Sequence, residues 1–444
     1  MALAEEDIAL PTLLGDWTPQ RLLVAARMCG FVRRRRKKDV WVLVWVLVLG
    51  FSVGARRCLT GLHHSYSRYA EELVTFGAFQ KWFSAELVVL LKQLVFSLIE
   101  QQHASLKVPE HLLGRFAEVI ALDSSVVNLH RFLAGRYPAT NKGKAAAKLH
   151  AVINVFDSTV KKVIFTGQRT ADLTVHRRLG PWVAGRLLLF DLGYFHHSLF
   201  KRIDDNGGFF VCRLKRSANP LIVADNHKGA GRRRQLVGHK LRDVLDGLHR
   251  DIIDLTVEVN VKKRVYRGRR RTEAWQVRLL GQRRPDGSYF LYYTNVPAED
   301  LGGDDICAVY ALRWQVELLF ACLKGHLRLH HLPSRRREVV EALMWAAILS
   351  HLVSRRLFRW VRLQVPAQRH MPSRRFAHLF ARIAAELLEL VLHPQPHRWH
   401  RLQRQLIREA PDPNKRRRDR SLQAIPLPDE LRHREHRRVR DNAA

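Results

Sequence analysis

Cysteine is scarce in this chain, and none of its cysteines forms a C-x-x-C pair. The five residues are scattered over the sequence: Cys29, Cys58, Cys212, Cys307 and Cys322. This scarcity argues against a disulfide framework and a zinc finger, and it suits a reducing cytoplasm. Cys322, His326 and His330 recur every four residues on one predicted helix, but no fourth ligand is evident, so a zinc site is not favoured.

Negative charge is also in short supply. The chain has 41 Asp and Glu against 76 Lys and Arg, which gives a formal net charge of +35 and a pI near 11.0. Such an excess repels itself unless a polyanion offsets it, so nucleic acid is the expected partner. Any single basic run could be a solvated loop, yet several are spread along the chain: Arg33–Lys38, Arg232–Arg234, Lys262–Arg271, Arg335–Arg337 and Lys415–Arg418. Together they predict that several domains contact a phosphate backbone.

One long apolar run, Val40–Gly54, follows six basic residues and superficially resembles a signal anchor. As a helix it would rise about 22 Å, against a hydrocarbon core of about 30 Å. We therefore expect a buried helix of an all-α N-terminal domain and no membrane partner. A membrane-anchored basic protein is the alternative, and it depends on this run alone.

The pattern of apolar residues changes along the chain, and the changes suggest domain boundaries. Helical spacing runs to about residue 113. Short buried or alternating strands then interleave with helices, which indicates a mixed α/β fold. The first predicted strand starts at residue 119. The other predicted strands cover residues 148–156, 161–167, 185–191, 207–215, 254–261, 273–281 and 288–296. We expect a helical DNA-binding domain at 1–113, an α/β core at 114–218 and 298–393, a β-rich insertion at 219–297, and a flexible basic tail at 394–444.

Two aspartates stand at the ends of predicted strands. Asp123 follows the apolar run that begins at Val119, and Asp191 closes the run from Gly185. In open α/β sheets, ligands and metal ions bind at the carboxyl ends of the strands. An aspartate there is also a common turn former or helix cap, so this pair alone does not establish a site.

A helix near residue 310 carries a polar stripe. Tyr310, Arg313, Glu317 and Lys324 fall within about 60° of one another at 100° per residue, opposite an apolar stripe. The polar residues could therefore face a cleft. The alternative is an ordinary surface helix on which Arg313 and Glu317 pair at i, i+4.

This stripe resembles the signature of the DDE transposases of bacterial insertion sequences, in particular insertion-sequence family four. The family's third acid lies within Y-x2-R-x3-E-x6-K, a spacing that residues 310 to 324 meet in full. Further matches are D-S-S at 123–125, K-L-H at 148–150, D-x-G-Y at 191–194 and T-N at 294–295. The resemblance implies an RNase H-like core with a β-strand insertion between the second aspartate and the glutamate. The β pattern of residues 219–297 agrees with it independently.

The resemblance also implies the chemistry. Asp123, Asp191 and Glu317 would hold two Mg²⁺ ions, which Mn²⁺ can replace, to cleave phosphodiesters and transfer strands. Tyr310, Arg313 and Lys324 would bind phosphates beside the cut. Either Trp314 or Trp275 would stack a flipped base. The expected activity is cut-and-paste transposition.

The expected partner is double-stranded DNA, both the element ends and the target, bound by a homodimer in the bacterial cytoplasm at the nucleoid. Residues 1–113 would recognise the ends, and the β insertion with Lys262–Arg271 would grip the backbone. Two alternatives stay open. One is a retired transposase that only binds DNA, although its acids are intact. The other is a nuclease of the same fold that only hydrolyses.

Overall fold

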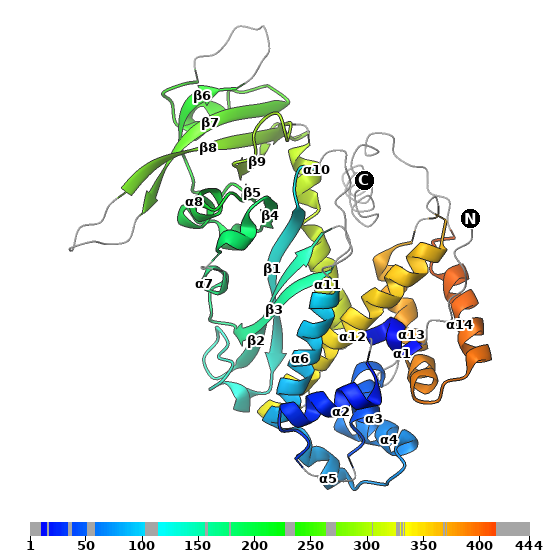
Figure 1. Ribbon diagram of the computed structural model, residues 1–444. Helices are drawn as coiled ribbons and strands as arrows, with labels where there is room; N and C mark the ends of the chain where they lie inside the picture. Colours follow the sequence, from blue (N-terminus) through cyan, green and yellow to red (C-terminus); the bar gives the residue numbers. More distant parts are fainter. Residues whose placement is uncertain are drawn as a thin grey trace.

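The structure is a computed structural model of the 444-residue chain (Figure 1). It describes residues 10–15, 17–33, 38–50, 58–102, 114–155, 159–176, 179–226, 236–262, 272–303, 305–325, 329, 332, 334–366, 369 and 371–413. Of the five basic runs, only Arg335–Arg337 lies wholly within these ranges. His326 and His330 of the disfavoured zinc site lie outside them.

A nine-stranded mixed sheet forms the centre of the molecule, in the order β3-β2-β1-β4-β5-β9-β8-β7-β6. The strands are β1 (Glu118–Leu129), β2 (Ala145–Asn154), β3 (Val160–Gly167), β4 (Arg186–Phe190), β5 (Phe209–Arg213), β6 (Leu221–Asp225), β7 (Ile252–Lys262), β8 (Thr272–Arg283) and β9 (Tyr289–Thr294). The predicted mixed α/β class is confirmed.

The first five strands carry both pairing modes. β1, β2 and β3 form an antiparallel meander, whereas β4 pairs parallel to β1 and β5 parallel to β4. We expected the first strand to end at Asp123, and this is wrong. β1 runs six residues further because β2 pairs with it as far as Leu129.

Residues 219–297, the predicted β insertion, contain strands β6 to β9, which extend the same sheet rather than forming a second one. β9 pairs antiparallel with β5, and β8, β7 and β6 follow outward. In Figure 1, β6, β7 and β8 lie at the upper left, away from α12 and the N-terminal helices. The side chains of β7 alternate between buried and half-exposed, as its sequence pattern predicts.

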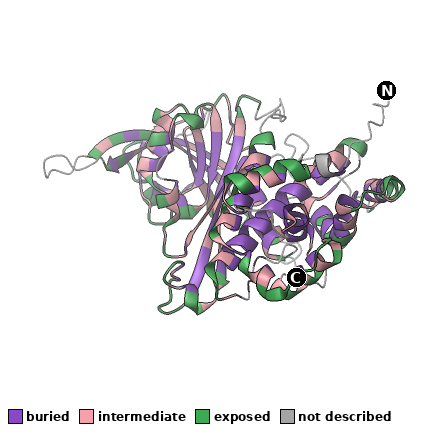
Figure 2. Ribbon diagram, turned by 60° about the horizontal axis from the view of Figure 1, so that its bottom comes forward, coloured by how far each residue is buried: buried purple, intermediate pink, exposed green. Residues whose placement is uncertain are grey.

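Helices lie before, between and after the strands. They are α1 (Leu10–Gly15), α2 (Pro19–Met28), α3 (Val40–Leu49), α4 (Leu59–Tyr69), α5 (Phe76–Lys81), α6 (Ala85–Gln102), α7 (Asp172–Val175), α8 (His197–Asp205), α9 (Leu241–Leu245), α10 (Ile306–Ala311), α11 (Trp314–Gly325), α12 (Arg337–Gln364), α13 (Ser373–Leu392) and α14 (Pro396–Glu409). Figure 2 shows the helices near the sheet buried on their inner sides and exposed on their outer sides.

The apolar run at Val40 forms α3, and every residue of this helix except Trp41 is buried. The prediction of a buried helix is therefore confirmed for Val40–Leu49. Among the described residues, the stretch Ile306–Gly325 is long and apolar enough to cross a membrane by length and composition, and half of its most apolar window is buried inside the protein. A core helix of a soluble protein passes the same test.

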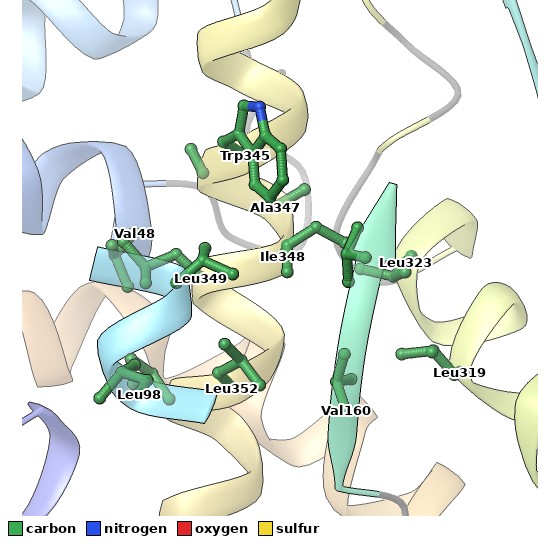
Figure 3. Packing of buried hydrophobic residues seen from close by; sticks show 14 of the residues in the cluster. Val48, Leu98, Val160, Leu319, Leu323, Trp345, Ala347, Ile348, Leu349 and Leu352 are labelled. Atoms are coloured by element: carbon green, nitrogen blue, oxygen red, sulfur yellow. The ribbon is translucent and has the colours of Figure 1, made fainter. Parts of the chain in front are cut away.

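The long helix α12 joins the N-terminal helices to the sheet. Figure 3 shows Leu349 and Leu352 of α12 near Val48 of α3 and Leu98 of α6, while Ile348 points toward β3 and α11. One apolar cluster runs through all of these elements. The Ser350 hydroxyl also donates to the Val48 carbonyl at 2.6 Å. The N-terminal helices therefore do not form the separate module that we expected from their sequence, because their core is shared with α12 and α13.

Two further expectations need correction. The flexible tail predicted from residue 394 is wrong for Pro396–Glu409, because this stretch forms α14 and buries Trp399, Leu402 and Leu406. Their spacing of three and four residues is an apolar helix stripe, hidden in the sequence by the surrounding Arg and His. Residues 414–444 of the predicted tail lie outside the described residues. The helix predicted around residue 310 is two helices, because i to i−3 backbone bonds at Leu312 and Arg313 tighten the chain between α10 and α11.

We predict that a fragment starting at residue 114 will not fold alone. Its loss of α3 and α6 would expose the apolar face of α12 to water, which favours aggregation or a loosely packed state. Thermal unfolding and dye binding would check this, and adding residues 1–113 as a second chain should restore a cooperative transition. A monomeric fragment that unfolds cooperatively without that addition would contradict the shared core.

Candidate active site

The parallel pairing of β1 and β4 places the two predicted aspartates side by side. Paired positions run from Glu118 and Arg186 to Leu122 and Phe190. The next residue on each strand is an acid, Asp123 on β1 and Asp191 at the end of β4. Neighbouring strands lie about 4.8 Å apart, so two carboxylates meet at the point where the parallel pairing ends.

Glu317, the predicted third acid, is linked to Asp123 by the side chain of Arg313. Arg313 Nη1 donates to Asp123 Oδ2 at 3.1 Å, and its Nη2 donates to Glu317 Oε1 at 2.6 Å. Asp123 Oδ1 also accepts from the Ser124 backbone N–H at 2.7 Å. The i, i+4 pair of the alternative interpretation is therefore present, but Arg313 also reaches the sheet, so that it joins two of the three acids.

Burial dominates the charge behaviour of this cluster. It raises the pKa of Asp123 to about 6, and the nearby Asp191 and Glu317 raise it too, while the Ser124 N–H and the Arg313 guanidinium lower it. Burial alone would lower the pKa of Arg313, but Tyr310, Glu317 and Asp123 raise it above its usual value. Arg313 therefore stays charged and compensates acids that repel one another.

Two donors in this cluster lack partners. The Tyr310 hydroxyl and Arg313 Nε are buried without a hydrogen bond within the described ranges. Burial raises the pKa of Tyr310, so its hydroxyl stays protonated. Buried donors without acceptors are costly and call for an explanation such as a missing ligand. Phosphate oxygens are suitable acceptors.

A divalent metal ion fits this donor set chemically, because Mg²⁺ prefers carboxylate oxygens. The arrangement, however, is an ion-paired one. No group of three His, Cys, Asp or Glu side chains in the described part of the chain is placed to hold a metal ion. The guanidinium of Arg313 supplies positive charge to two of the acids in its place.

The remaining predicted site residues, Lys324, Trp314 and Trp275, differ in where they lie relative to the three acids. Lys324 is on α11 two turns beyond Glu317, half-buried, and burial lowers its pKa. Trp314 begins α11 and is also half-buried. Trp275 lies on β8, only 9% exposed, with its ring 6.1 Å from that of Phe210. The structure therefore brings Lys324 and Trp314 onto the helix of Glu317 and places Trp275 in the apolar core of the insertion.

A second polar cluster, formed by Lys148, His150, Asp172, His176 and Tyr194, was not predicted as a unit. Lys148 Nζ and His150 Nδ1 lie 3.3 and 3.5 Å from Asp172 Oδ1, and the His176 ring lies 5.7 Å from that of Tyr194. Burial lowers the pKa of both histidines to about 4, so they are neutral. The K-L-H and D-x-G-Y matches pointed to Lys148, His150 and Tyr194. Only the fold adds Asp172 and His176.

Comparisons with known proteins show which family this chain resembles. Residues 114–353 match the family described as Transposase DDE domain. The transposase for insertion sequence element IS231E of Bacillus thuringiensis subsp. finitimus is 22% identical over 382 residues, which cover 78% of this chain and 79% of the relative. The IS231B transposase of B. thuringiensis subsp. berliner is 20% identical over 371 residues, covering 75% and 76%.

A further relative is the transposase for element IS1151 of Clostridium perfringens, 22% identical over 308 residues that cover 62% of this chain and 65% of that protein. Among solved structures, a cryo-EM structure of the piggyBac transposase synaptic complex with hairpin DNA has a TM-score of 0.43 and 10% identity, covering 94% of this chain and 87% of that one. The family match covers more than half of the 444 residues and spans all three acids, so this chain belongs to the DDE transposases.

Proposed function

We propose that this transposase acts by cut-and-paste, with metal-dependent phosphodiester hydrolysis and strand transfer at the ends of an insertion sequence. The observation that carries the proposal is the convergence of three acids from separate parts of the chain. β1 and β4 bring Asp123 and Asp191 together in parallel register, and Arg313 links Asp123 to Glu317. Incubation with the element's own ends and Mg²⁺, followed by analysis for double-strand breaks and joined products, tests it.

The catalytic core is proposed to be RNase H-like. The five strands from β3 to β5 are in the order β3-β2-β1-β4-β5, with an antiparallel meander followed by two parallel strands. This order supports the assignment, as does the position of β6 to β9 between Asp191 and Glu317 in the sequence. The core boundaries at 114–218 and 298–393 and the insertion boundary at 219–297 remain part of the same proposal.

Asp123, Asp191 and Glu317 are proposed to hold two Mg²⁺ ions, for which Mn²⁺ can substitute. Bound there, the ions would supply an activated nucleophile and relief of charge on the leaving oxygen. Tyr310 and Arg313 would donate their unpartnered O–H and Nε–H to phosphate oxygens of the bound DNA. Lys324 would contact a phosphate farther along the strand as a point charge.

Of the two tryptophans proposed to stack a flipped base, Trp314 is the better placed. It is half-buried at the start of α11, three residues before Glu317. Trp275 would have to leave an apolar core in which it is 9% exposed. We therefore assign the stacking role to Trp314.

The proposed partner is double-stranded DNA, bound by a homodimer at the nucleoid in the bacterial cytoplasm. The net charge of +35 supports DNA as the partner. Residues 1–113 are proposed to recognise the element ends, and the insertion with Lys262–Arg271 to grip the backbone. A retired transposase would bind the ends without cutting them, and a hydrolysis-only nuclease would cut without joining, so the same incubation separates all three functions.

We predict that Asp123→Asn, Asp191→Asn and Glu317→Gln each reduce cleavage at least tenfold while DNA affinity stays within a few fold. The carboxylates serve catalysis, and near phosphates their negative charge opposes binding. Cleavage of end-labelled DNA and fluorescence anisotropy measure the two quantities. A Glu317→Gln protein that keeps more than about a tenth of the wild-type rate would show that the third acid is misassigned.

Calcium should support DNA binding but not cutting. Its larger, looser oxygen shell holds phosphates without the octahedral geometry that suits Mg²⁺. Parallel assays in Ca²⁺ and Mg²⁺ would check this. Efficient cutting in Ca²⁺ alone would count against the proposed site.

Arg313→Gln should lower the free energy of unfolding in the absence of metal by about 1–3 kcal/mol, because it leaves partly buried acids without a cation. The matched control is Lys201→Gln, which removes the exposed pair of Lys201 with Asp205 on α8. That change should cost at most about 1 kcal/mol. Urea unfolding measures both, and equal effects would contradict a compensating role for Arg313.

A further inference from the structure

Phe132 is the most exposed phenylalanine or tryptophan in the part of the chain that the structure describes, with 61% of its surface open. It lies in a short 3-10 turn, η1 (Arg131–Leu133), directly after β1. No part of the proposed catalytic chemistry uses it. A single exposed apolar side chain is common on protein surfaces, so the groups that surround this ring decide what it can bind.

The backbone around this ring is fixed, so its exposure is built into the fold. His130 Nδ1 accepts from the Phe132 N–H at 3.4 Å, and the Tyr137 N–H donates to the Leu133 carbonyl at 2.8 Å. Leu133 and Tyr137 are buried in the main apolar cluster. Leu133 and Tyr137 face the core, while the Phe132 ring faces outward.

Cationic and aromatic groups surround the ring. The His130 ring is stacked with it at 5.1 Å and 24°. The guanidinium carbons of Arg335 and Arg131 lie 5.2 and 5.6 Å from its centroid. Arg335 belongs to the basic run before α12, far away in the sequence, so the fold brings this run to the tip of β1.

The surrounding charge is positive. Arg136 and Arg337 expose about half of their side chains, and both pair with Glu341. The Glu341 carboxylate is largely buried and also accepts from the Tyr137 hydroxyl at 2.8 Å. The negative charge of Glu341 is therefore offset by Arg136, Arg337 and the Tyr137 hydroxyl. An apolar protein partner would have to dehydrate these cations, whereas a polyanion would pair with them.

The ring lies within reach of DNA at the acids. Asp123 and Leu129 are six residues apart on β1, which is about 20 Å at 3.3 Å per residue. This equals the length of about six base pairs at 3.4 Å each. The anchors Leu133 and Tyr137 belong to the same apolar cluster as Val316 and Leu319 of α11. The residues that anchor the turn and those that anchor α11 therefore pack in one continuous apolar core.

We propose that Phe132, with His130, Arg131 and Arg335, is a stacking site for an unpaired DNA base about six base-pair lengths from the phosphate that is cut. An unpaired base presents a free π-face, which a duplex hides except at its ends. Aromatic rings and guanidinium planes stack on such faces, and the cations hold the flanking phosphates. This inference rests on the proposed function for the position of the DNA.

The test uses a duplex that carries one unpaired 2-aminopurine in a short single-stranded extension, with a fully paired duplex as reference. Binding is measured by anisotropy in Ca²⁺, and stacking by quenching of 2-aminopurine fluorescence. Phe132→Leu should weaken binding of the extended DNA about 5- to 100-fold and abolish the quenching, while affinity for the paired duplex stays within twofold. Phe132→Trp should restore both.

Trp182→Leu is the matched control, since Trp182 is 42% exposed but precedes β4 at the end of the parallel strands away from the acids. It should leave both readouts unchanged. Quenching that survives in Phe132→Leu, or an equal loss in Trp182→Leu, would overturn the proposal. The assay needs no cleavage, so a wild-type protein that stacks the base through Phe132 but never cuts DNA would refute the proposed function and leave this site standing.

Discussion

The candidate active site depends on one arginine, Arg313, which allows the like-charged Asp123, Asp191 and Glu317 to lie close together at the edge of the β1–β4 pairing. Asp123 and Asp191 stand at neighbouring positions because β1 and β4 are parallel and in register. Glu317 raises the pKa of Asp123 further, so the three acids repel one another. Arg313 offsets this repulsion by pairing with Asp123 and Glu317. Without a cation between them, this part of the fold would hold an uncompensated cluster of negative charge.

The shared core explains how the arginine is kept in place. α11 contacts β1, β2 and α12, and its Leu319 and Leu323 face Val160 of β3 in Figure 3. α12 in turn packs against α3 and α6, so a change in the packing of these N-terminal helices would alter the position of a helix that contacts α11. The proposed recognition of DNA by the N-terminal helices would be connected to the acids through this packing.

Much of the fold and the site could be predicted from the sequence because the signals were local. Alternation predicted β7 and β8, and apolar runs predicted β4 and α3. The polar stripe from Tyr310 to Lys324 was predicted on one helix, whereas the structure divides it between α10 and α11 and buries Tyr310. The predictions that were wrong concerned elements whose structure depends on residues far away in the sequence. β1 continues past Asp123 because β2 pairs with it, and α14 packs its three apolar side chains on the helical core. The link from Arg313 to Asp123, and the meeting of Phe132 with Arg335, join segments that no local pattern connects.

Asp123, Asp191 and Glu317 are proposed to form one metal site, and this can be measured by replacing Mg²⁺ with Fe²⁺, adding ascorbate and peroxide, and mapping where hydroxyl radicals formed at the bound iron cut the polypeptide. If the three acids share the metal, cuts appear near residues 123, 191 and 317, excess Mg²⁺ suppresses them, and they weaken together in Glu317→Gln. Cuts confined to one of these segments, or insensitive to Mg²⁺, would contradict a shared metal site.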